Sequence, residues 1–293
     1  MILAAIDIGS NAVRLLISQA TPEKDGGVFY TKINLVRIPL RLGMDVFDSG
    51  AIGADKTRTF IDTMKAFKLL MDVYGVEHYK ACATSAMRDA ANGSELVKAA
   101  REKAGIDIDI ISGHEEATVL YETHFAQTLN HNQKYLYIDV GGGSTEVSLF
   151  ENSRVRFSES FNIGTIRLLR KHVRRAQWDG FKLYIKSQTK NSGKLKAIGS
   201  GGNINKVFAL SKQKEGCPLS LEYLKNRYQE LRGLTVDERM HRYNIRQDRA
   251  DVIVPALRIY TSVMRWGGID EIYVPKIGLA DGLIRMLYEQ YHR

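Results

Sequence analysis

Two short segments of this chain join an aspartate to a glycine turn, directly after an apolar run. The first reads IDIGSN from Ile6, and the second reads IDVGGGST from Ile138. Glycine allows positive φ and leaves backbone N–H groups uncovered, so that several of them can converge on one anion. The aspartate at the end of each run offers the hard oxygen ligand that Mg²⁺ prefers. Either segment alone is also typical of an ordinary hairpin turn, but two copies favour a pair of phosphate sites.

The two segments align Asp7 with Asp139, and each continues into a second apolar run, so the pattern repeats after 132 residues. A repeat of this length indicates two domains rather than a solenoid. We place the boundary between them near residues 122–134. A third glycine turn, Gly199–Gly202, follows a short apolar run and opens a helical stretch, which is another arrangement that can bind an anion.

Two further polar clusters follow predicted strands in the first half. The segment ATSAMR ends with Arg88, which we expect at the sheet edge that carries Asp7. A guanidinium there could neutralise phosphoryl charge, although a surface ion pair is the commoner role of such an arginine. The segment SGHEE begins a helix with Glu115 and Glu116, which either complement the helix dipole or serve catalysis. Helical geometry turns the two side chains ~100° apart, so at most one of them faces a central cleft.

The spacing of apolar residues predicts the elements that position these groups. They recur every three or four positions from Phe60 to Tyr74, which is typical of one helix face, and Gly75 ends the pattern. From Tyr135 onward, two strands flank the second glycine turn. This order of strands and helices predicts an α/β fold with a mixed sheet and helices on its faces. The other predicted elements of the first half are strands over Leu3–Ile8, Val13–Ser18, Val28–Pro39 and Tyr79–Thr84, a helix over Ser94–Gly105, a strand over Ile106–Ile111 and a helix from Gly113.

Composition and charge narrow the class of protein. An apolar fraction of 44% and a charged fraction of 26% in 293 residues exclude a disordered, fibrous or disulfide-stapled protein. The formal charge is +9, but its distribution is uneven. Residues 1–150 carry 15 Lys+Arg against 19 Asp+Glu, whereas residues 151–293 carry 27 against 14. The basic second half favours a polyanionic partner.

The remaining sequence features concern the compartment. The two cysteines, Cys82 and Cys217, have no metal-like spacing and indicate a reducing environment. The N-terminal MILAAIDIGSN lacks the features of a signal peptide, and no run reaches the roughly 18 apolar residues of a transmembrane helix. We therefore expect a cytoplasmic protein without a membrane partner.

One basic cluster in the second half could form a track for a linear polyanion. Arg167, Arg170, Lys171 and Arg174 share one face of a helix that we predict to begin near Gly164. Such stripes are also typical of solvated surfaces. Because the chain has no zinc-finger spacing, aromatic RNA-binding pattern or clear helix-turn-helix, we expect no nucleic-acid partner. Binding to a long polyanion would weaken steeply with salt.

The chain also contains five motifs in the order and rough spacing of one family. They are AAIDIGSNAVRLLI, ATSAMRDAANG, IISGHEEA, YIDVGGGSTEVSLF and AIGSGGNINKV. Together they resemble the exopolyphosphatase/guanosine pentaphosphate phosphatase (Ppx/GppA) family in its short, two-domain form. The resemblance implies two actin-like (ribonuclease H-like) domains, 1–124 and 125–293, each a mixed sheet flanked by helices, with an active-site cleft between them. The last helix either stays with the second domain or packs back on the first.

The resemblance also implies roles for individual residues. Glu116 would activate the attacking water, Arg88 would clamp the phosphates, and Glu146 would hold the water or the metal. The metal, Mg²⁺, would bind Asp139, Asp7 and Glu146. The terminal phosphates would lie against Gly9, Ser10, Asn11, Gly142, Gly143, Ser144 and Thr145.

These roles supply the charge neutralisation and the positioned water that in-line displacement at a phosphoryl group needs. The resemblance therefore implies a Mg²⁺-dependent exopolyphosphatase that removes terminal phosphate from inorganic polyphosphate, with guanosine pentaphosphate as the alternative substrate. A non-catalytic regulator that binds polyphosphate or an alarmone is an alternative of another class, and a kinase of the same superfamily is a third. Homodimerisation is an expectation from the resemblance alone.

Three positions depart from the family pattern. The usual arginine after the EEA is Thr118, the glycine one turn later is Glu122, and an arginine of a late GLREG-type segment is Ala280. These departures leave substrate preference and the level of activity open.

Overall fold

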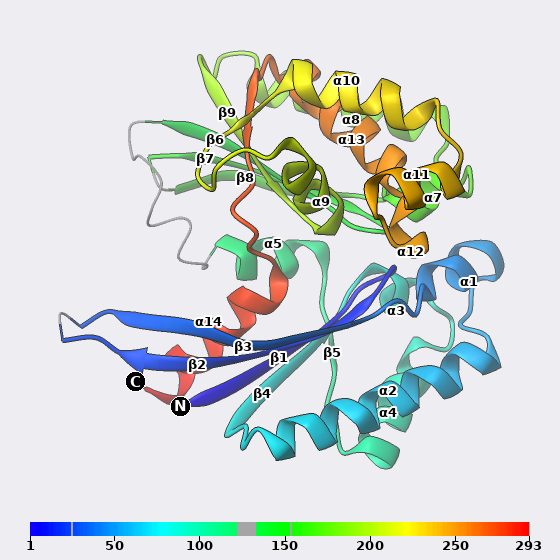
Figure 1. Cartoon of the computed structure of the whole chain (residues 1–293), viewed down its shortest axis with the longest axis vertical. Coiled ribbons are helices and arrows are strands. Elements are labelled where there is room, and N and C mark those ends of the chain that lie inside the picture. The colour runs from blue at the N-terminus through cyan, green and yellow to red at the C-terminus, as the bar shows by residue number, and fades with distance from the viewer. Residues whose placement is uncertain (25, 122–132, 153, 293) are drawn as a thin grey trace. The chain divides into compact units, whose positions relative to one another are not determined.

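A computed structural model describes residues 1–24, 26–121, 133–152 and 154–292 (Figure 1). The chain divides into two compact units, and each is described by itself. Unit 1 consists of Met1–Thr123 and Gly278–Arg293, and unit 2 consists of His124–Ile277. Most of the predicted boundary region, residues 122–132, lies outside the described residues, and so does Glu122.

Unit 1 is built on a mixed sheet with the strand order β3-β2-β1-β4-β5. Its central strand, β1, pairs antiparallel with β2 and parallel with β4. Both faces of β1 are covered, which is the physical reason for its nearly continuous apolar sequence. The elements of unit 1 are β1 (Ile2–Ile8), β2 (Val13–Pro22), β3 (Val28–Ile38), α1 (Leu42–Ser49), α2 (Ala54–Val73), β4 (His78–Ala83), α3 (Ser85–Asp89), α4 (Gly93–Ala104), β5 (Asp109–Ile110), α5 (Gly113–Tyr121) and α14 (Leu279–Tyr291).

Helices cover both faces of this sheet. On one face, Phe60 and Phe67 of α2 are fully buried in a cluster that includes Ile6 of β1. On the other face, α14 packs on β1, β2, β4 and α5, with Leu283 fully buried beside Leu3. The last helix therefore belongs to unit 1, although the predicted second domain, 125–293, extends to the end of the chain.

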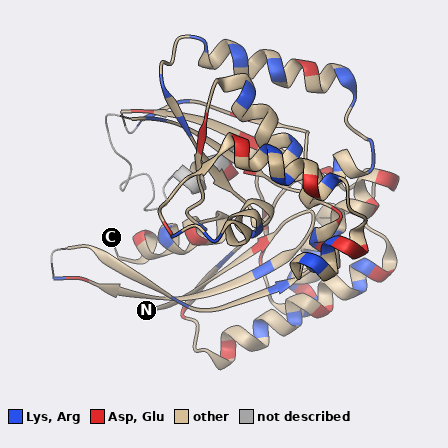
Figure 2. Ribbon diagram, turned by 45° about the horizontal axis from the view of Figure 1, so that its top comes forward, with Lys and Arg blue, Asp and Glu red and all other residues tan. Residues whose placement is uncertain are grey.

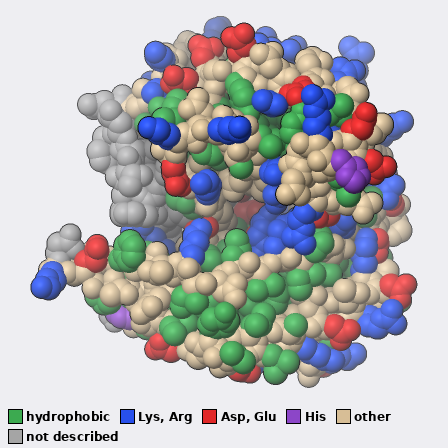
Figure 3. All heavy atoms as spheres, in the orientation of Figure 1, with side chains coloured by type: hydrophobic (Ala, Val, Ile, Leu, Met, Phe, Trp, Pro, Cys, Tyr) green, Lys and Arg blue, Asp and Glu red, His purple; other side chains and the backbone are tan. Residues whose placement is uncertain are grey.

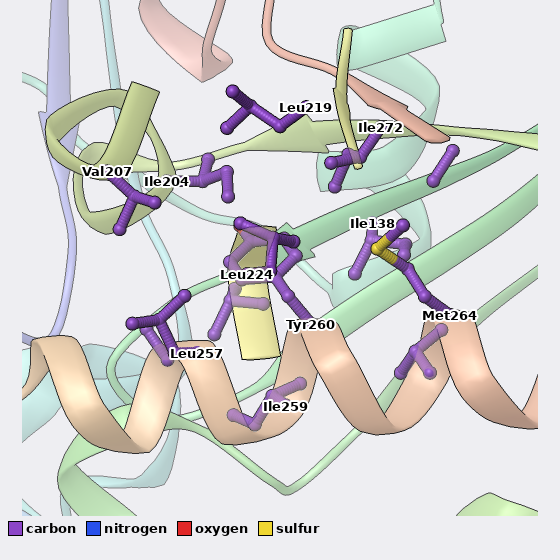
Figure 4. Close-up of a cluster of buried hydrophobic side chains, with 14 of the residues drawn as sticks. Ile138, Ile204, Val207, Leu219, Leu224, Leu257, Ile259, Tyr260, Met264 and Ile272 are labelled. Carbon is purple, nitrogen blue, oxygen red and sulfur yellow. The ribbon is translucent and has the colours of Figure 1, made fainter. Parts of the chain in front are cut away.

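Unit 2 contains a sheet with the strand order β10-β11-β9-β6-β7-β8. The long helix α13 supplies much of its core, in which Ile138, Leu224 and Tyr260 gather in one cluster (Figure 4). The elements of unit 2 are β6 (Lys134–Val140), β7 (Thr145–Glu151), β8 (Arg154–Phe161), α7 (Thr165–Leu169), α8 (Arg175–Thr189), β9 (Leu195–Ser200), α9 (Gly202–Ser211), β10 (Leu219–Ser220), α10 (Leu221–Arg232), α11 (Val236–Tyr243), α12 (Gln247–Ala250), α13 (Ile253–Gly267) and β11 (Glu271–Tyr273).

The predicted repeat is confirmed at the level of strands and turns. β1 and β2 form an antiparallel pair around the first glycine turn, and β6 and β7 form the same pair around the second. The turns also close alike, since Gly9 N donates to Ala12 O at 3.1 Å and Gly141 N donates to Ser144 O at 3.0 Å.

The predicted helix that carries four basic residues on one face is wrong. Helix α7 ends at Leu169, Lys171 has a left-handed φ of 60°, and Arg174 precedes the start of α8. A continuous helix would place Arg170 beside Arg174 at i,i+4, and like charges at this spacing destabilise a helix. The basic residues are therefore spread over a short helix and the turn that follows it.

Charged and apolar side chains are distributed differently over the surface. Figure 2 shows Lys and Arg on several helices of both units, with Asp and Glu among them. Figure 3 shows a group of hydrophobic side chains on the visible face of unit 1. The edge strand β3 contributes to the exposed apolar surface of this unit through Phe29 and Leu35. In the described part of the chain, no helix is long and apolar enough to cross a membrane.

Candidate functional site

Two carboxylates of unit 2 lie directly opposite each other on adjacent strands. Asp139 of β6 pairs in register with Glu146 of β7, so both side chains emerge on the same face of the sheet. Ser200 of β9 and Ser160 of β8 extend this row on either side. Glu146 is only 2% exposed, and one of its oxygens accepts a hydrogen bond from Ser160 Oγ at 2.8 Å. Like charges that face each other destabilise a sheet, so this pair favours a bound cation.

The adjacent glycine turn directs its carbonyl groups toward α7. Thr165 N donates to Gly141 O at 3.0 Å, Ile166 N to Gly142 O at 2.8 Å, and Arg167 Nε to Gly143 O at 2.8 Å. In a trans peptide the N–H points opposite to the C=O. The N–H groups that follow these three carbonyls therefore point away from α7 and can meet an anion, although Gly141, Gly142 and Gly143 do not adopt the positive φ that glycine allows. They belong to Gly142, Gly143 and Ser144.

The first glycine turn has the same construction in unit 1. Gly43 N, in the first turn of α1, donates to Ser10 O at 2.9 Å, and Arg41 N donates to Asn11 O at 3.1 Å. The N–H groups of the next residues, Asn11 and Ala12, point away from α1 by the same argument. Each unit thus presents a turn whose carbonyls are held by a neighbouring helix and whose N–H groups are turned outward.

The two turns differ in the charge that accompanies the aspartate. Asp7 of β1 pairs in register with Arg14 of β2, and Arg14 Nη1 lies 2.5 Å from Asp7 Oδ2. In unit 2 the equivalent of Arg14 is Glu146. Because Asp7 has a cationic partner and Asp139 faces another carboxylate, the geometry favours unit 2 as the holder of a metal ion. The prediction that Asp7 also binds the metal stays a prediction.

The structure separates the roles of the two adjacent carboxylates on α5. Glu115 Oε2 accepts a hydrogen bond from Ser112 N at 2.7 Å, and Ser112 Oγ accepts one from Glu115 N at 3.1 Å, which is a capping box. These hydrogen bonds lower the pKa of Glu115. Glu115 therefore caps the helix, and Glu116 remains the candidate catalytic carboxylate of this pair.

Glu116 and Asp7 both act electrostatically on one buried thiol, that of Cys82. Cys82 of β4 pairs in register with Asp7, and burial raises the pKa of this thiol to about 12, with further contributions from the negative charges of Asp7 and Glu116. Both carboxylates thus lie close to one buried side chain, and Glu116 Oε2 is itself buried. The predicted role of Glu116 in activating water stays a prediction.

Arg88 has a specific partner in this structure. Its Nη1 donates to Ile111 O at 2.8 Å, directly before the residue that caps α5. Its Nε lies 3.9 Å from Asp89 Oδ1, which is a weak contact by comparison. Arg88 therefore ties α3 to the start of the helix that carries Glu116, and its predicted contact with phosphate stays a prediction.

Two hydroxyl groups at the glycine turns make hydrogen bonds to other parts of their own unit. Thr145 Oγ1 donates to Ile163 O, and Ser10 Oγ lies 2.9 Å from Ser85 Oγ. Thr145 is fully buried. For these two residues the structure shows a positioning role, whereas their predicted contacts with phosphate are untested.

Sequence reasoning missed two residues that shape the site in unit 2. A Cβ on Gly164 would lie 2.3 Å from Gly142 O, so only glycine lets α7 approach the second turn. Tyr260 is 1% exposed and donates its hydroxyl to Ser200 O. Burial raises the pKa of Tyr260 well above its ordinary value, and the charge of Asp139 raises it further, so the hydroxyl remains a donor. Neither residue lies in a recognisable motif, because both act through contacts distant in sequence.

The predicted polyanion track is only partly exposed surface. Arg170, Lys171 and Arg174 are exposed, whereas Arg167 is half-buried and holds Gly143 O. Arg239, another basic residue of the second half, also stabilises the fold. Its guanidinium donates hydrogen bonds to the carbonyl groups of Leu231, Leu234 and Ala250. The net charge of the second half therefore overstates the basic surface that is available to a ligand.

The residues present fit a hard divalent cation. Among the described residues, no group of three or more His, Cys, Asp and Glu side chains could hold a metal. Mg²⁺ does not need such a group, because it commonly binds through one or two carboxylates, with waters and substrate phosphates in the other positions. The neighbouring carboxylates of Asp139 and Glu146, next to the second glycine turn, match that pattern.

Comparisons with known proteins agree with this geometry. The sequence model of the Ppx/GppA phosphatase family matches residues 23–180, which is more than half of the chain. The crystal structure of an Aquifex aeolicus member of that family superimposes with a TM-score of 0.77 at 26% identity, over 100% of this chain and 99% of that one. The fold of two actin-like domains, each a mixed sheet flanked by helices, is thereby confirmed.

Two curated relatives match a shorter stretch. An exopolyphosphatase 1 of Mycobacterium tuberculosis is 31% identical over 173 residues, which are 58% of this chain and 48% of that protein. A guanosine-5'-triphosphate,3'-diphosphate pyrophosphatase of Vibrio cholerae is 28% identical over 174 residues, which are 59% of this chain and 34% of that protein. The match thus spans no more than about half the length of either relative.

Proposed function

Since the chain belongs to the Ppx/GppA phosphatase family, we propose that it removes the terminal phosphate of inorganic polyphosphate by Mg²⁺-dependent hydrolysis. The observation that carries the proposal is the pairing, in unit 2, of two facing carboxylates with a turn whose N–H groups point outward. An anion-binding turn next to two carboxylates that can bind a cation suits a phosphate group with a bound metal ion.

Asp139 and Glu146 would hold the metal ion, and the N–H groups of Gly142, Gly143 and Ser144 would bind phosphate oxygens. A bound Mg²⁺ neutralises charge on the phosphoryl oxygens. Ser160 keeps Glu146 in place, and the hydrogen bond from Arg167 to Gly143 O fixes the turn. These positions are set before substrate arrives, which is how electrostatic preorganisation accelerates phosphoryl transfer.

Glu116 would accept the proton of the attacking water. The water oxygen bonds to the terminal phosphorus, the bridging P–O bond breaks, and the shortened chain leaves with the electron pair. The capping box at Glu115 and the contact from Arg88 to Ile111 O fix the start of α5, and therefore the direction of Glu116. The prediction that both turns serve one cleft stays a prediction.

Guanosine pentaphosphate is the second candidate substrate, and the named activity of the Vibrio cholerae relative favours it. The departures from the family pattern keep a binding function without turnover as a third outcome. Thr118 donates its hydroxyl to His114 O, and Ala280 is 6% exposed in the cluster beneath α14, so neither supplies a charge. The cytoplasmic location and the homodimer expected above remain predictions.

One assay separates these functions. The pure chain is incubated with Mg²⁺ and long-chain polyphosphate, guanosine pentaphosphate or ATP, and released inorganic phosphate is measured. We expect release from polyphosphate. Release from guanosine pentaphosphate alone would identify the alarmone phosphatase. Binding of polyphosphate without release from any substrate would identify the regulator and contradict the proposed hydrolysis.

The metal role of the facing carboxylates predicts a specific loss in Asp139→Asn. Removing one charge should raise the Mg²⁺ concentration for half-maximal phosphate release about tenfold or more, because one of two anionic ligands is lost. Mg²⁺ should also raise the thermal unfolding midpoint of the wild type but not of the variant. Asp179→Asn is the matched control, since Asp179 is 55% exposed and pairs with Arg175 on α8. Equal Mg²⁺ dependence in all three proteins would rule out Asp139 as a ligand.

A further inference from the structure

Unit 2 contains a pocket of about 320 Å³ at the opposite end of its sheet from the second glycine turn. Lys134, the first residue of β6, and Glu151, the last residue of β7, line it. Lys134 precedes Asp139 by five residues of extended strand, which places the two Cα atoms roughly 16 Å apart. The pocket is therefore separate from the candidate phosphate site, and its volume lies in the range of small-molecule sites, about 300–1,000 Å³.

One wall of the pocket is an ordered network of charges. Glu151 Oε1 lies 2.6 Å from Lys134 Nζ, and Glu151 Oε2 lies 3.2 Å from Arg156 Nε. A single carboxylate thus holds two cations, and the three groups together carry a net charge of +1. Arg156 contacts Glu151 through Nε. Its two terminal nitrogens, Nη1 and Nη2, suit bidentate binding of a phosphate.

The opposite wall also favours an anion with hydroxyl groups. Gln188 and Asn191, at and beyond the end of α8, supply exposed amides that both donate and accept hydrogen bonds. A helix C-terminus carries about half a negative charge, which would disfavour an anion. However, the residues that line the pocket include two cations, Lys134 and Arg156, and one carboxylate, Glu151, so their formal charge is +1.

Leu149 and Phe157 also line the pocket, but most of its exposed surface is polar. Leu149 is 4% exposed, and the ring of Phe157 packs edge-on against Tyr184 at a centroid distance of 5.6 Å. The hydroxyl groups of a sugar attached to the phosphate suit such a polar surface, with its amides and serines, better than an inorganic ion alone does. The chemistry of the lining therefore favours a molecule with a charged end and several hydroxyl groups.

We propose that this pocket binds a small phosphate monoester of a sugar or nucleoside, at a site distinct from the Asp139–Glu146 pair. The phosphate lies against Lys134 and Arg156, the sugar hydroxyls meet Gln188 and Asn191, and the body of the ligand covers Leu149 and Phe157. This site does not depend on the proposed hydrolysis, because none of these residues belongs to the second glycine turn or to the facing carboxylates.

The test is a titration of the full chain with ribose 5-phosphate, adenosine 5'-monophosphate and inorganic phosphate, by calorimetry and by amide chemical shifts. At least one ester should saturate, with shifts at Gln188, Asn191 and Ser192, and inorganic phosphate should bind about tenfold or more weakly because it lacks the hydroxyls. The ester that binds more tightly identifies the source of the ligand. Equal affinity for inorganic phosphate and both esters would overturn the proposal.

Four variants locate the binding. Arg156→Gln should weaken the ester about tenfold, and Ser187→Phe, which fills the pocket without changing charge, should abolish binding. Arg175→Gln, a 96% exposed arginine outside the pocket, is the matched charge control and should bind as the wild type does. Glu146→Gln should also leave ester binding intact. Wild-type affinity in both pocket variants, or loss of binding in Glu146→Gln, would place the ester elsewhere and contradict the proposal.

Discussion

Glu116→Gln should lower the rate of phosphate release from polyphosphate by about 10²- to 10⁴-fold while leaving polyphosphate binding nearly unchanged. Glutamine has the same shape as glutamate but cannot accept the proton of the attacking water. The negative charge of Glu116 acts on the buried thiol of Cys82, and its residue is not part of the turn that would bind phosphate. The measurements are steady-state phosphate release and calorimetric titration with polyphosphate in the presence of Mg²⁺.

The neighbouring carboxylate provides the matched control for this variant. Glu115→Gln changes the same charge on the same turn of α5, but glutamine preserves the capping box with Ser112. We therefore expect Glu115→Gln to retain activity within a few-fold of the wild type. An equal loss in both variants would assign the effect to the fold of α5, and full activity in Glu116→Gln would remove it as the base.

Gly164→Ala should reduce phosphate release by about 10²-fold and destabilise the protein by about 1–3 kcal/mol. Gly164 has an extended backbone that alanine can adopt, so the effect is one of space and not of backbone strain. The added Cβ would lie 2.3 Å from Gly142 O and 2.4 Å from the carbonyl carbon of Gly143. The second glycine turn must shift to admit it, and the N–H groups that would bind phosphate shift with it.

A second glycine of unit 2 is the control for this substitution. Gly180 lies within α8, and a Cβ there would meet no atom within 4 Å. Gly180→Ala should therefore leave activity unchanged and raise stability by about 0.5–1 kcal/mol, the usual gain of alanine in a helix. Denaturant unfolding and phosphate release measured on both variants distinguish the two outcomes. Wild-type activity in Gly164→Ala would show that the second turn is not part of the site.

Much of the local structure could be predicted because it depends on residues close in sequence. The strands around both glycine turns follow from apolar runs that end in an aspartate, and the α2 pattern follows from helical spacing. The basic helix was predicted wrongly by the same method, since the spacing of charges does not reveal that α7 ends at Leu169 and that Lys171 adopts a left-handed φ. Strand β5 is also shorter than predicted, at Asp109–Ile110.

The choice between Glu115 and Glu116 shows what the sequence alone could not explain. Their spacing allows at most one of them to face a central cleft, and the resemblance favoured Glu116. The hydrogen bonds of Glu115 with Ser112 provide a physical reason for that choice, because they occupy one carboxylate in capping. The predicted helix start at Gly113 agrees with α5, but the sequence did not show which of the two carboxylates would accept the hydrogen bond from Ser112 N.

The sequence by itself determined the repeat, the two glycine turns and the residue types that could bind phosphate and a cation, because these are local patterns of apolar spacing and turn chemistry. Only the tertiary structure decided how those residues are used. Register between strands sets Asp139 against Glu146 but Asp7 against Arg14, and helix packing makes Gly164, Arg167 and Tyr260 part of the site. These are contacts between residues far apart in the chain, which form only when the whole core of each unit is in place.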